Sequence, residues 1–372
     1  MTGMSRVFVG SLTRETGYFK HAHGEGISVL DFDETTGGLS LRHRIGGIDN
    51  PTFLAFSRDG RHLYATSEVF GWNEGMITAY RIAQDGSLSY INKQATLGSI
   101  AAHCSLDQTG RFAFAANYAH EPWNGYGPDV PGQAVAVFPL GTDGGLGAAI
   151  SHVAHQGTGP IPFRQTWPHP HCVAASPDNR FVIVTDLGTD RLHSYRFDDG
   201  RLSSQDAPPP LALGPGAGPR HFIFAPGGDH AYVINELNGT VAHLAYDAPS
   251  GGFEIRQVVS TLPAAFTGLN NCADLHLSPD GRFLYGSNRG HNSIAIFAVD
   301  PHSGDLSPAG HVPTGGEWPR SFALSVTGRF LLVANQDSDS LTIFLRDEQV
   351  GGLEQIGAFA IGTPMAISVH PI

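Results

Sequence analysis

A strand–turn–strand unit recurs six times along the chain, and this repeat constrains the fold more than any other feature. Each unit begins with a strand of alternating apolar residues and ends with a nearly continuous apolar strand, as expected when both faces are buried. The turn between them carries Asp-Gly, Asp-Asn, Thr-Gly or Gly-Gly, which adopt positive φ at low cost. The hairpins cover residues 53–66, 104–116, 172–185, 222–234, 275–287 and 322–334. Repetition at about fifty residues indicates one supersecondary unit used many times.

Two further strands follow every hairpin. The third strands lie at residues 75–80, 134–138, 191–195, 240–244, 293–297 and 340–344. A fourth strand follows a Gly-rich turn, as at residues 86–90 and 352–356. Four antiparallel strands in each repeat are typical of a β-propeller blade. The sequence therefore predicts an all-β protein built from four-stranded blades.

The two ends of the chain predict how the ring closes. Residues 364–370 resemble the first strand of another unit, but the chain stops at Ile372. Residues 6–10 resemble a second strand, and residues 28–32 and 38–41 supply the third and fourth. One blade is thus expected to be shared between the N- and C-termini, which removes open sheet edges. Six whole units and one split unit predict a seven-bladed β-propeller, with residues 1–372 forming a single domain.

Composition excludes several classes of function. The formal net charge is -12, which argues against a nucleic-acid-binding protein because such proteins need a basic field. No apolar run approaches the roughly 18 residues of a membrane span, so no membrane partner is expected. Cys104, Cys172 and Cys272 are far apart and odd in number, which predicts neither a disulfide framework nor a CxxC metal motif. With no signal-peptide pattern at the N-terminus, we expect a cytoplasmic protein.

Hairpin geometry brings two sets of residues to one rim of the channel. The strands of a hairpin are antiparallel, so residues that precede each first strand lie beside residues that end each second strand. The first set is Pro51-Thr52, Ala102-His103, Pro170-His171, Pro219-Arg220, Ala273-Asp274 and Pro319-Arg320. The second set is Ser67-Glu68, Asn117-Tyr118, Asp186-Leu187, Asn235-Glu236, Asn288-Arg289 and Asn335-Gln336. Polar groups that converge at a concave mouth predict a ligand site.

The residue types in these sets indicate acid–base and anion chemistry. We expect His171, Arg220, Glu236 and Arg289 to be catalytic. Substrate binding is expected of the neighbouring side chains Glu68, His103, Tyr118, His169, His221 and Arg320. Arginine binds carboxylate or phosphate with a planar fork and can stabilise an oxyanion, while glutamate or histidine can accept a proton. The chain has no Gly-x-Ser-x-Gly elbow, so covalent nucleophilic catalysis lacks support.

Other features have more ordinary explanations. The asparagines that end second strands, such as Asn117 and Asn288, are expected to have a structural role in capping turns. Neither His21-x-His23, in a loop interpreted as a mobile insertion, nor His169-x-His171 favours a metal, and no cofactor is expected. The long connections at residues 119–132 and 156–168 emerge on the same rim, and either bind a ligand or decorate the surface.

Several motifs resemble the seven-bladed propeller lactonase family, which includes the bacterial propeller type of 6-phosphogluconolactonase and the fungal carboxy-cis,cis-muconate lactonising enzyme. The most specific are His169-Pro-His171 before a Ser-Pro-Asp turn, Gly218-Pro-Arg-His221, Asn235-Glu-Leu237 and Ser287-Asn-Arg-Gly290. The resemblance runs nearly end to end. It implies a metal-free site, and His171, Arg220, Glu236 and Arg289 match the positions at which the family places its proposed active-site groups.

Three functions remain as hypotheses. The first is hydrolysis of a sugar lactone, 6-phosphogluconolactone above all, by direct attack of water. The second is a cycloisomerase that closes a carboxymuconate-type diacid, for which Arg320 would serve as an additional cationic anchor. The third is a non-enzymatic propeller that binds a partner through exposed aromatic residues such as Trp123, Tyr126 and Trp167.

Overall fold

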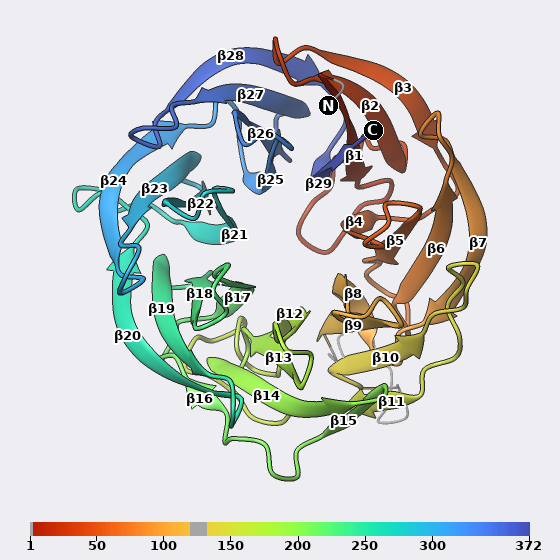
Figure 1. The fold of residues 1–372 in the computed structure, drawn as a ribbon, viewed down its shortest axis with the longest axis vertical. Coiled ribbons are helices and arrows are strands. Elements are labelled where there is room, and N and C mark those ends of the chain that lie inside the picture. Colours follow the sequence, from red (N-terminus) through yellow and green to blue (C-terminus); the bar gives the residue numbers. More distant parts are fainter. Residues whose placement is uncertain (1–2, 120–131) are drawn as a thin grey trace.

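A computed structural model describes residues 3–119 and 132–372, and it shows seven antiparallel sheets arranged in a ring around a central channel (Figure 1). The first strand of each blade lines the channel and the fourth lies at the periphery. The prediction of an all-β, seven-bladed propeller is confirmed. In the described part of the chain, no helix is long and apolar enough to cross a membrane.

The N-terminal half contains the shared blade and the next three. The shared blade has β29 (Pro364–Pro371), β1 (Met4–Ser11), β2 (Ile27–Asp33) and β3 (Leu39–Ile45). The next has β4 (Pro51–Phe56), β5 (His62–Ser67), β6 (Met76–Ile82) and β7 (Leu88–Ala95). The third has β8 (Ser99–Leu106), β9 (Phe112–Ala119), β10 (Val135–Pro139) and β11 (Ser151–Val153). The fourth has β12 (Pro170–Ala175), β13 (Phe181–Asp186), β14 (Arg191–Asp198) and β15 (Arg201–Ser203), with β16 (Leu211–Ala212) also paired to β14.

Three blades complete the ring. The fifth blade has β17 (Pro219–Phe224), β18 (His230–Asn235), β19 (Thr240–Asp247) and β20 (Gly252–Ser260). The sixth has β21 (Asn271–Leu277), β22 (Phe283–Arg289), β23 (Ser293–Val299) and β24 (Leu306–Pro313). The seventh has β25 (Pro319–Leu324), β26 (Phe330–Asn335), β27 (Ser340–Arg346) and β28 (Leu353–Ala360). Among the described residues, the blade containing β16 alone departs from four strands, because its outer edge is divided between two short strands.

The predicted closure of the ring is confirmed. Strand β1 pairs with β2 on one side and with the C-terminal β29 on the other, with Val7 opposite Val369. The termini therefore lie in the same blade (Figure 1). Every edge of β1 is hydrogen-bonded, so neither end of the chain leaves an inner strand open.

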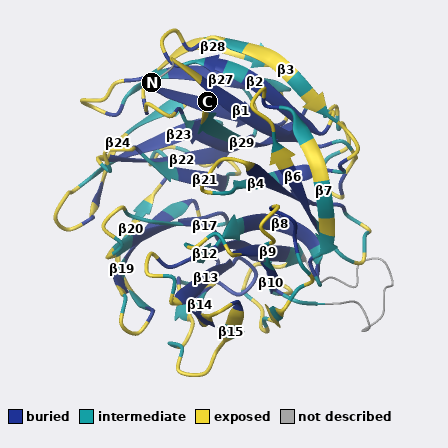
Figure 2. Ribbon diagram, turned by 45° about the vertical axis from the view of Figure 1, so that its right-hand side comes forward, coloured by how far each residue is buried: buried dark blue, intermediate teal, exposed yellow. Residues whose placement is uncertain are grey.

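The hydrophobic core lies between blades. Buried residues form seven clusters, and each cluster joins two neighbouring blades, as where Phe32 of β2 packs edge-on against Phe330 of β26. Inner strands are buried and outer strands such as β3 and β7 are largely exposed (Figure 2). This arrangement leaves the centre of the ring free of a core, so the centre is available for polar side chains.

Two backbone features recur near the channel. The predicted positive-φ turns are confirmed, for example at Gly60 and Asn179. In addition, every first strand has a register shift close to its beginning, as between Pro219 and His221 in β17. A β-bulge of this kind re-aims a side chain. In β17 the extra residue is Arg220, which is thereby directed toward the channel.

Candidate active site

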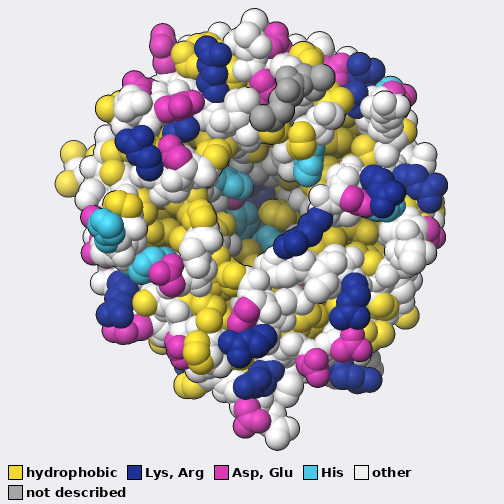
Figure 3. All heavy atoms as spheres, viewed as in Figure 1, with side chains coloured by type: hydrophobic (Ala, Val, Ile, Leu, Met, Phe, Trp, Pro, Cys, Tyr) yellow, Lys and Arg dark blue, Asp and Glu magenta, His cyan; other side chains and the backbone are white. Residues whose placement is uncertain are grey.

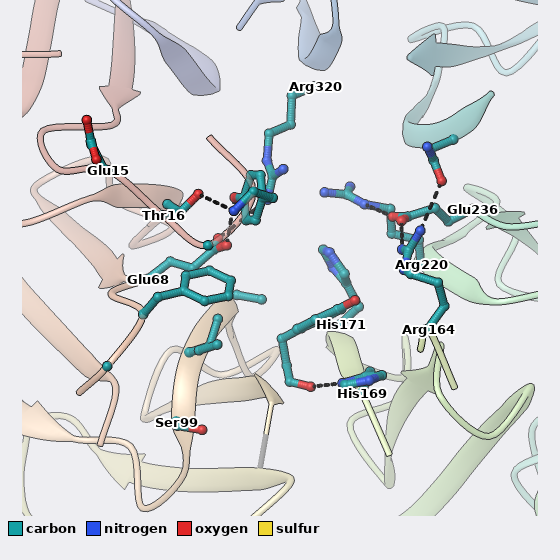
Figure 4. A pocket seen from close by; sticks show the side chains of 18 of the residues that line it. Glu15, Thr16, Glu68, Ser99, Arg164, His169, His171, Arg220, Glu236 and Arg320 are labelled. Carbon is teal, nitrogen blue, oxygen red and sulfur yellow. Dashed lines mark hydrogen bonds and ion pairs between the residues drawn. The ribbon is translucent and has the colours of Figure 1, made fainter. Parts of the chain in front are cut away.

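A cavity of about 640 Å³ lies at one mouth of the channel and collects most of the side chains that the sequence analysis selected. Eight of the ten predicted residues line it: Glu68, Tyr118, His169, His171, Arg220, Glu236, Arg289 and Arg320. Figure 4 shows Glu68 and Glu236 on opposite sides of the cavity, with His171 between them. Seen face-on, the ring has a central hollow in which histidine side chains are visible (Figure 3).

Glu236 is the centre of an arginine cluster. It follows β18 directly, and its Oε2 atom lies 3.0 Å from Arg220 Nε and 2.7 Å from Arg289 Nη2. Its Oε1 atom accepts a hydrogen bond from Arg164. Burial alone would raise the pKa of Glu236, but Arg289, Arg164 and Arg220 outweigh that effect and hold the pKa below its ordinary value. Glu236 is therefore ionised, and three cations against one anion leave an excess of positive charge.

Backbone carbonyls hold the arginine side chains in place. Arg220 Nη1 donates to Ala273 O over 2.7 Å, and Arg289 Nη2 donates to Cys272 O over 3.0 Å. Arg289 also lies over the ring of Trp318, 5.6 Å from its centroid. Burial, with the nearby charges of Arg289 and Arg320, lowers the pKa of Arg220 to about 9. Arg220 remains a cation at neutral pH, and its guanidinium is fixed before any ligand arrives.

His171 differs from the arginines because it has no strong partner. It follows Pro170 at the bulge of β12, and its Nδ1 atom has no hydrogen-bond partner among the described residues. Its ring points into the middle of the cavity (Figure 4). Burial, together with the charges of Arg220 and Arg320, places the pKa of His171 well below its ordinary value. His171 is thus a neutral imidazole that can accept a proton at the cavity.

His169 and Tyr118 form the wall beside His171. Their rings stack with centroids 4.4 Å apart, and His169 Nδ1 lies 2.6 Å from the backbone oxygen of Tyr118. The backbone N–H of His169 donates to Asp186 Oδ1 over 2.8 Å. The segment that carries His171 is therefore fixed from both sides by buried groups.

The opposite wall contains Glu68, Arg320 and Tyr18. Glu68 Oε2 lies 3.5 Å from Arg320 Nη2, and Glu68 Oε1 accepts a hydrogen bond of 3.1 Å from the Tyr18 hydroxyl. These contacts are longer than those of Glu236, and the wall pairs one cation with one anion. The excess of positive charge around Glu236 therefore has no counterpart in the Glu68–Arg320 pair.

The structure does not place His103 or His221 at the cavity, contrary to the prediction that both bind substrate. Ala101 is paired with Asn117 in the way that Pro170 is paired with Asp186, so His103 corresponds to Cys172 and not to His171. His221 is likewise one residue beyond the bulge residue Arg220. Both side chains lie deeper in the channel, 5.8 Å apart between ring centroids. His103 was aligned with His171 because the comparison of hairpins did not allow for the bulge, whereas His221 was selected as the neighbour of Arg220.

Two further elements supply cavity residues that the sequence analysis did not select. Arg164 comes from the connection 156–168, so the interpretation of that connection as a binding element is supported by its position. Tyr18 and Lys20 come from residues 12–26, which were interpreted as an insertion. Hydrogen bonds such as Leu12 N to Thr363 O, 3.0 Å, hold this loop against the mouth. The connection 120–131, with Trp123 and Tyr126, lies outside the described residues.

The asparagines at the ends of second strands have the structural role predicted for them. Asn117 Nδ2 donates to Thr96 O over 2.8 Å and to Gln133 O over 3.0 Å. Asn288 Nδ2 donates to Thr261 O over 2.8 Å. These bonds tie the end of one blade to the loop that leaves the preceding blade.

Among the described residues, one group has the composition of a metal site, namely His155, Asp186 and His193, whose possible ligand atoms lie within 4.8 Å of one another. It does not line the cavity. Asp186 Oδ1 accepts the backbone N–H groups of His169, Gly188 and Thr189, and Asp186 Oδ2 lies 2.6 Å from His155 Nδ1. The two imidazoles are stacked 3.8 Å apart, so their nitrogens do not converge on one point. This arrangement suits a structural hydrogen-bond network that supports the His169 segment.

Fold and site together define a seven-bladed propeller with a cationic, small-molecule-sized cavity at its channel mouth. The chain belongs to the family described as "Lactonase, 7-bladed beta-propeller", which it matches over residues 6–369. The resemblance seen in the motifs is thereby confirmed.

Several relatives are similar over most of their length. The chain is 36% identical to a 6-phosphogluconolactonase of Bacillus subtilis over 84% of this chain and 86% of that protein. It is 34% identical to a 6-phosphogluconolactonase of Formosa agariphila over 86% of each chain. The solved structure of the periplasmic gluconolactonase of Pseudomonas aeruginosa superimposes with a TM-score of 0.90 at 35% identity, covering 99% of both chains.

Proposed function

We propose that this protein hydrolyses an anionic sugar lactone, with 6-phosphogluconolactone as the first substrate to test. The observation that carries the proposal is the neutral imidazole of His171 beside three guanidiniums that share the single carboxylate Glu236. A lactonase needs a base for water and donors for the oxyanion, and an anionic substrate needs surplus cations. The relatives named as 6-phosphogluconolactonases support this substrate class.

Each of these residues would have a distinct role in the reaction. Arg220 and Arg289 donate hydrogen bonds to the oxygen that becomes negatively charged, or to an anionic group of the substrate. The His171 ring accepts a proton from the attacking water. Glu236 is a poor base, because its oxygens are already occupied by Arg164, Arg220 and Arg289. We assign Glu236 the task of holding the arginines in position.

The first experiment measures hydrolysis of a panel of aldonolactones with and without a 6-phosphate, in the presence of a chelator. We expect turnover that survives chelation, with a higher kcat/KM for the phosphorylated lactone. Turnover abolished by the chelator and restored by added metal would contradict direct attack by water. Absence of turnover on every lactone would contradict the proposal as a whole.

A second candidate is the closure of a diacid by a cycloisomerase. It is favoured by one observation: Arg320 lines the cavity in addition to Arg289 and comes from a different blade, so two separate cationic anchors are available. Arg320 already faces Glu68, however, and this pairing reduces its charge toward a second carboxylate. Lactonisation of a carboxymuconate by protein that shows no lactonase activity would make this candidate the better one.

A further inference from the structure

We propose that Tyr18 is the general acid that protonates the leaving oxygen when the lactone ring opens. This inference rests on the proposed lactonase function and extends it to protonation of the leaving oxygen, for which the arginine cluster offers no proton source. Water attack needs a base, whereas expulsion of a sugar alkoxide needs an acid, since an alkoxide is a strongly basic leaving group.

The groups that can stabilise the oxyanion and the group that can donate a proton lie on different walls of the cavity. The Glu236 side presents arginines, and the His171 ring lies in the middle (Figure 4). Arginine keeps its proton at neutral pH and serves as a hydrogen-bond donor, not as a proton source. The opposite wall holds Tyr18 and Glu68, which are joined by the 3.1 Å hydrogen bond from the Tyr18 hydroxyl to Glu68 Oε1. Glu68 accepts this bond as a carboxylate, so the transferable proton belongs to Tyr18.

The surroundings of Tyr18 suit a proton donor. Although 48% of the residue is exposed, its hydroxyl is directed inward at Glu68. Burial raises the pKa of Tyr18 above its ordinary value, so the hydroxyl keeps its proton until the reaction, and the guanidinium of Arg320, 5.5 Å from the centre of the Tyr18 ring, partly offsets this effect. Phe70 packs edge-on against the ring with centroids 5.4 Å apart, which fixes its plane.

The loop that carries Tyr18 is held in one conformation by its own hydrogen bonds. Thr16 N donates to Phe19 O over 2.8 Å, and Phe19 N donates to Thr16 Oγ1 over 3.0 Å. At the base of the loop, His23 N donates to Thr363 Oγ1 over 2.9 Å. Tyr18 is therefore positioned at the mouth by a closed turn that is anchored to the shared blade.

The proposed step balances as follows. The oxygen of water bonds to the carbonyl carbon, and one of its protons passes to the His171 ring. The tetrahedral intermediate then collapses, and the bond from carbon to the ring oxygen breaks with its electron pair on that oxygen. The hydroxyl of Tyr18 turns from Glu68 and gives its proton to the same oxygen. Solvent water afterwards returns a proton to Tyr18 and removes one from His171, and ionisation of the product acid releases one proton overall.

A comparison of leaving groups tests this assignment. The Tyr18→Phe variant is assayed on a lactone and on the thiolactone of the same ring, because a thiolate leaves without protonation, thiols ionising near pH ~8.5. We expect kcat/KM for the lactone to fall about 10²–10⁴-fold and the thiolactone to be nearly unaffected. Tyr90→Phe, a change on the exposed face of β7, is the matched control and should leave both substrates unchanged.

Each result has a separate meaning. Equal losses on both substrates would overturn the proposal and give Tyr18 a positioning role for Glu68 and Arg320. No loss on either substrate would also overturn it. If the wild-type protein opens neither ring, the lactonase function itself fails, and that result is visible without any variant. Thermal unfolding of Tyr18→Phe at the wild-type temperature would exclude misfolding as the source of a loss.

Discussion

Two rings of side chains surround the channel one residue apart, and they have opposite characters. The ring at the bulge contains His171, Arg220 and Arg320, which border the cavity. The next ring contains His103 and His221, which lie below it. The bulge directs the side chain at one position toward the cavity and the side chain at the following position toward the floor of the channel. Neighbouring residues can therefore have different roles, one in contact with a ligand and the next in supporting the cavity wall.

The two rings also differ in how their charges are satisfied. The cavity ring has more cations than anions, whereas the floor ring contains neutral histidines around one buried carboxylate. His221 Nδ1 lies 2.8 Å from Asp274 Oδ1, and Ser321 Oγ donates to Asp274 Oδ2 over 3.0 Å. His221 Nε2 in turn accepts a 3.0 Å hydrogen bond from Arg220 Nη1. The hydrogen bonds of the floor ring are therefore made within the protein, whereas the cavity ring has an excess of positive charge that a ligand can balance.

The largest effect is expected from Glu236→Gln, which changes the carboxylate that holds Arg220 of the cavity ring. The amide cannot balance three guanidiniums, so Arg220 and Arg289 should repel each other and lose their positions. We expect kcat/KM for the best lactone to fall by at least about 10³-fold, since a single oxyanion donor contributes about 10²–10³. Steady-state kinetics with circular dichroism as a folding control checks this expectation. A variant that retains more than a tenth of wild-type activity would remove Glu236 from the site.

Next in size should be the effect of His171→Asn. Loss of a general base lowers the rate by about 10²–10⁴-fold. Because the pKa of His171 lies well below its ordinary value, chiefly through burial, the acid limb of the wild-type kcat/KM profile should lie below about pH 6.5. The residual activity of the variant should lose that limb. An acid limb that persists unchanged would assign the proton acceptor elsewhere.

Asp274→Asn tests whether the floor ring supports the cavity ring. An amide in place of the carboxylate can donate to His221 Nδ1, which reverses the tautomer and turns an N–H toward Arg220. We expect kcat to fall about tenfold to a hundredfold, less than loss of a whole oxyanion donor, with KM changing less. Asp305→Asn is the matched control, since Asp305 pairs with His243 at the periphery over 3.1 Å. Equal effects of the two variants would contradict coupling between the rings.

The smallest expected effect concerns stability and pH. Burial, reinforced by the neighbouring His221 and Arg220, holds the pKa of His103 well below its ordinary value in the folded state. The unfolded chain therefore binds the additional proton, and the free energy of unfolding should decrease as pH falls below about 6.5. His103→Gln should reduce this decrease by up to about 1.4 kcal/mol per pH unit, measured by urea unfolding between pH 7 and 5. An unchanged slope would show that His103 does not remain neutral in the fold.

Much of the fold could be predicted because the residues of each hairpin specify both its turn and its buried face. Turn residues such as Gly60 specify positive φ, and the alternation of apolar residues specifies which face is buried. The split blade followed from the incomplete units at the two termini. Glu68, Glu236 and Arg289 were located for the same reason, since the repeat marks the ends of the second strands: Glu68 and Glu236 directly follow such a strand and Arg289 is the last residue of one.

The remaining site residues depended on long-range contacts. The sequence by itself determined the number of blades, the closure between β29 and β1, and the rim on which polar residues gather, because these follow from periodicity and antiparallel pairing. Only the tertiary structure decided that His103 lies on the floor, since one extra residue in a bulge leaves no mark in the apolar pattern. It also brought Arg164 to Glu236 and Tyr18 to Glu68, because irregular loops have no period and their positions are set by the hydrogen bonds they make to distant blades.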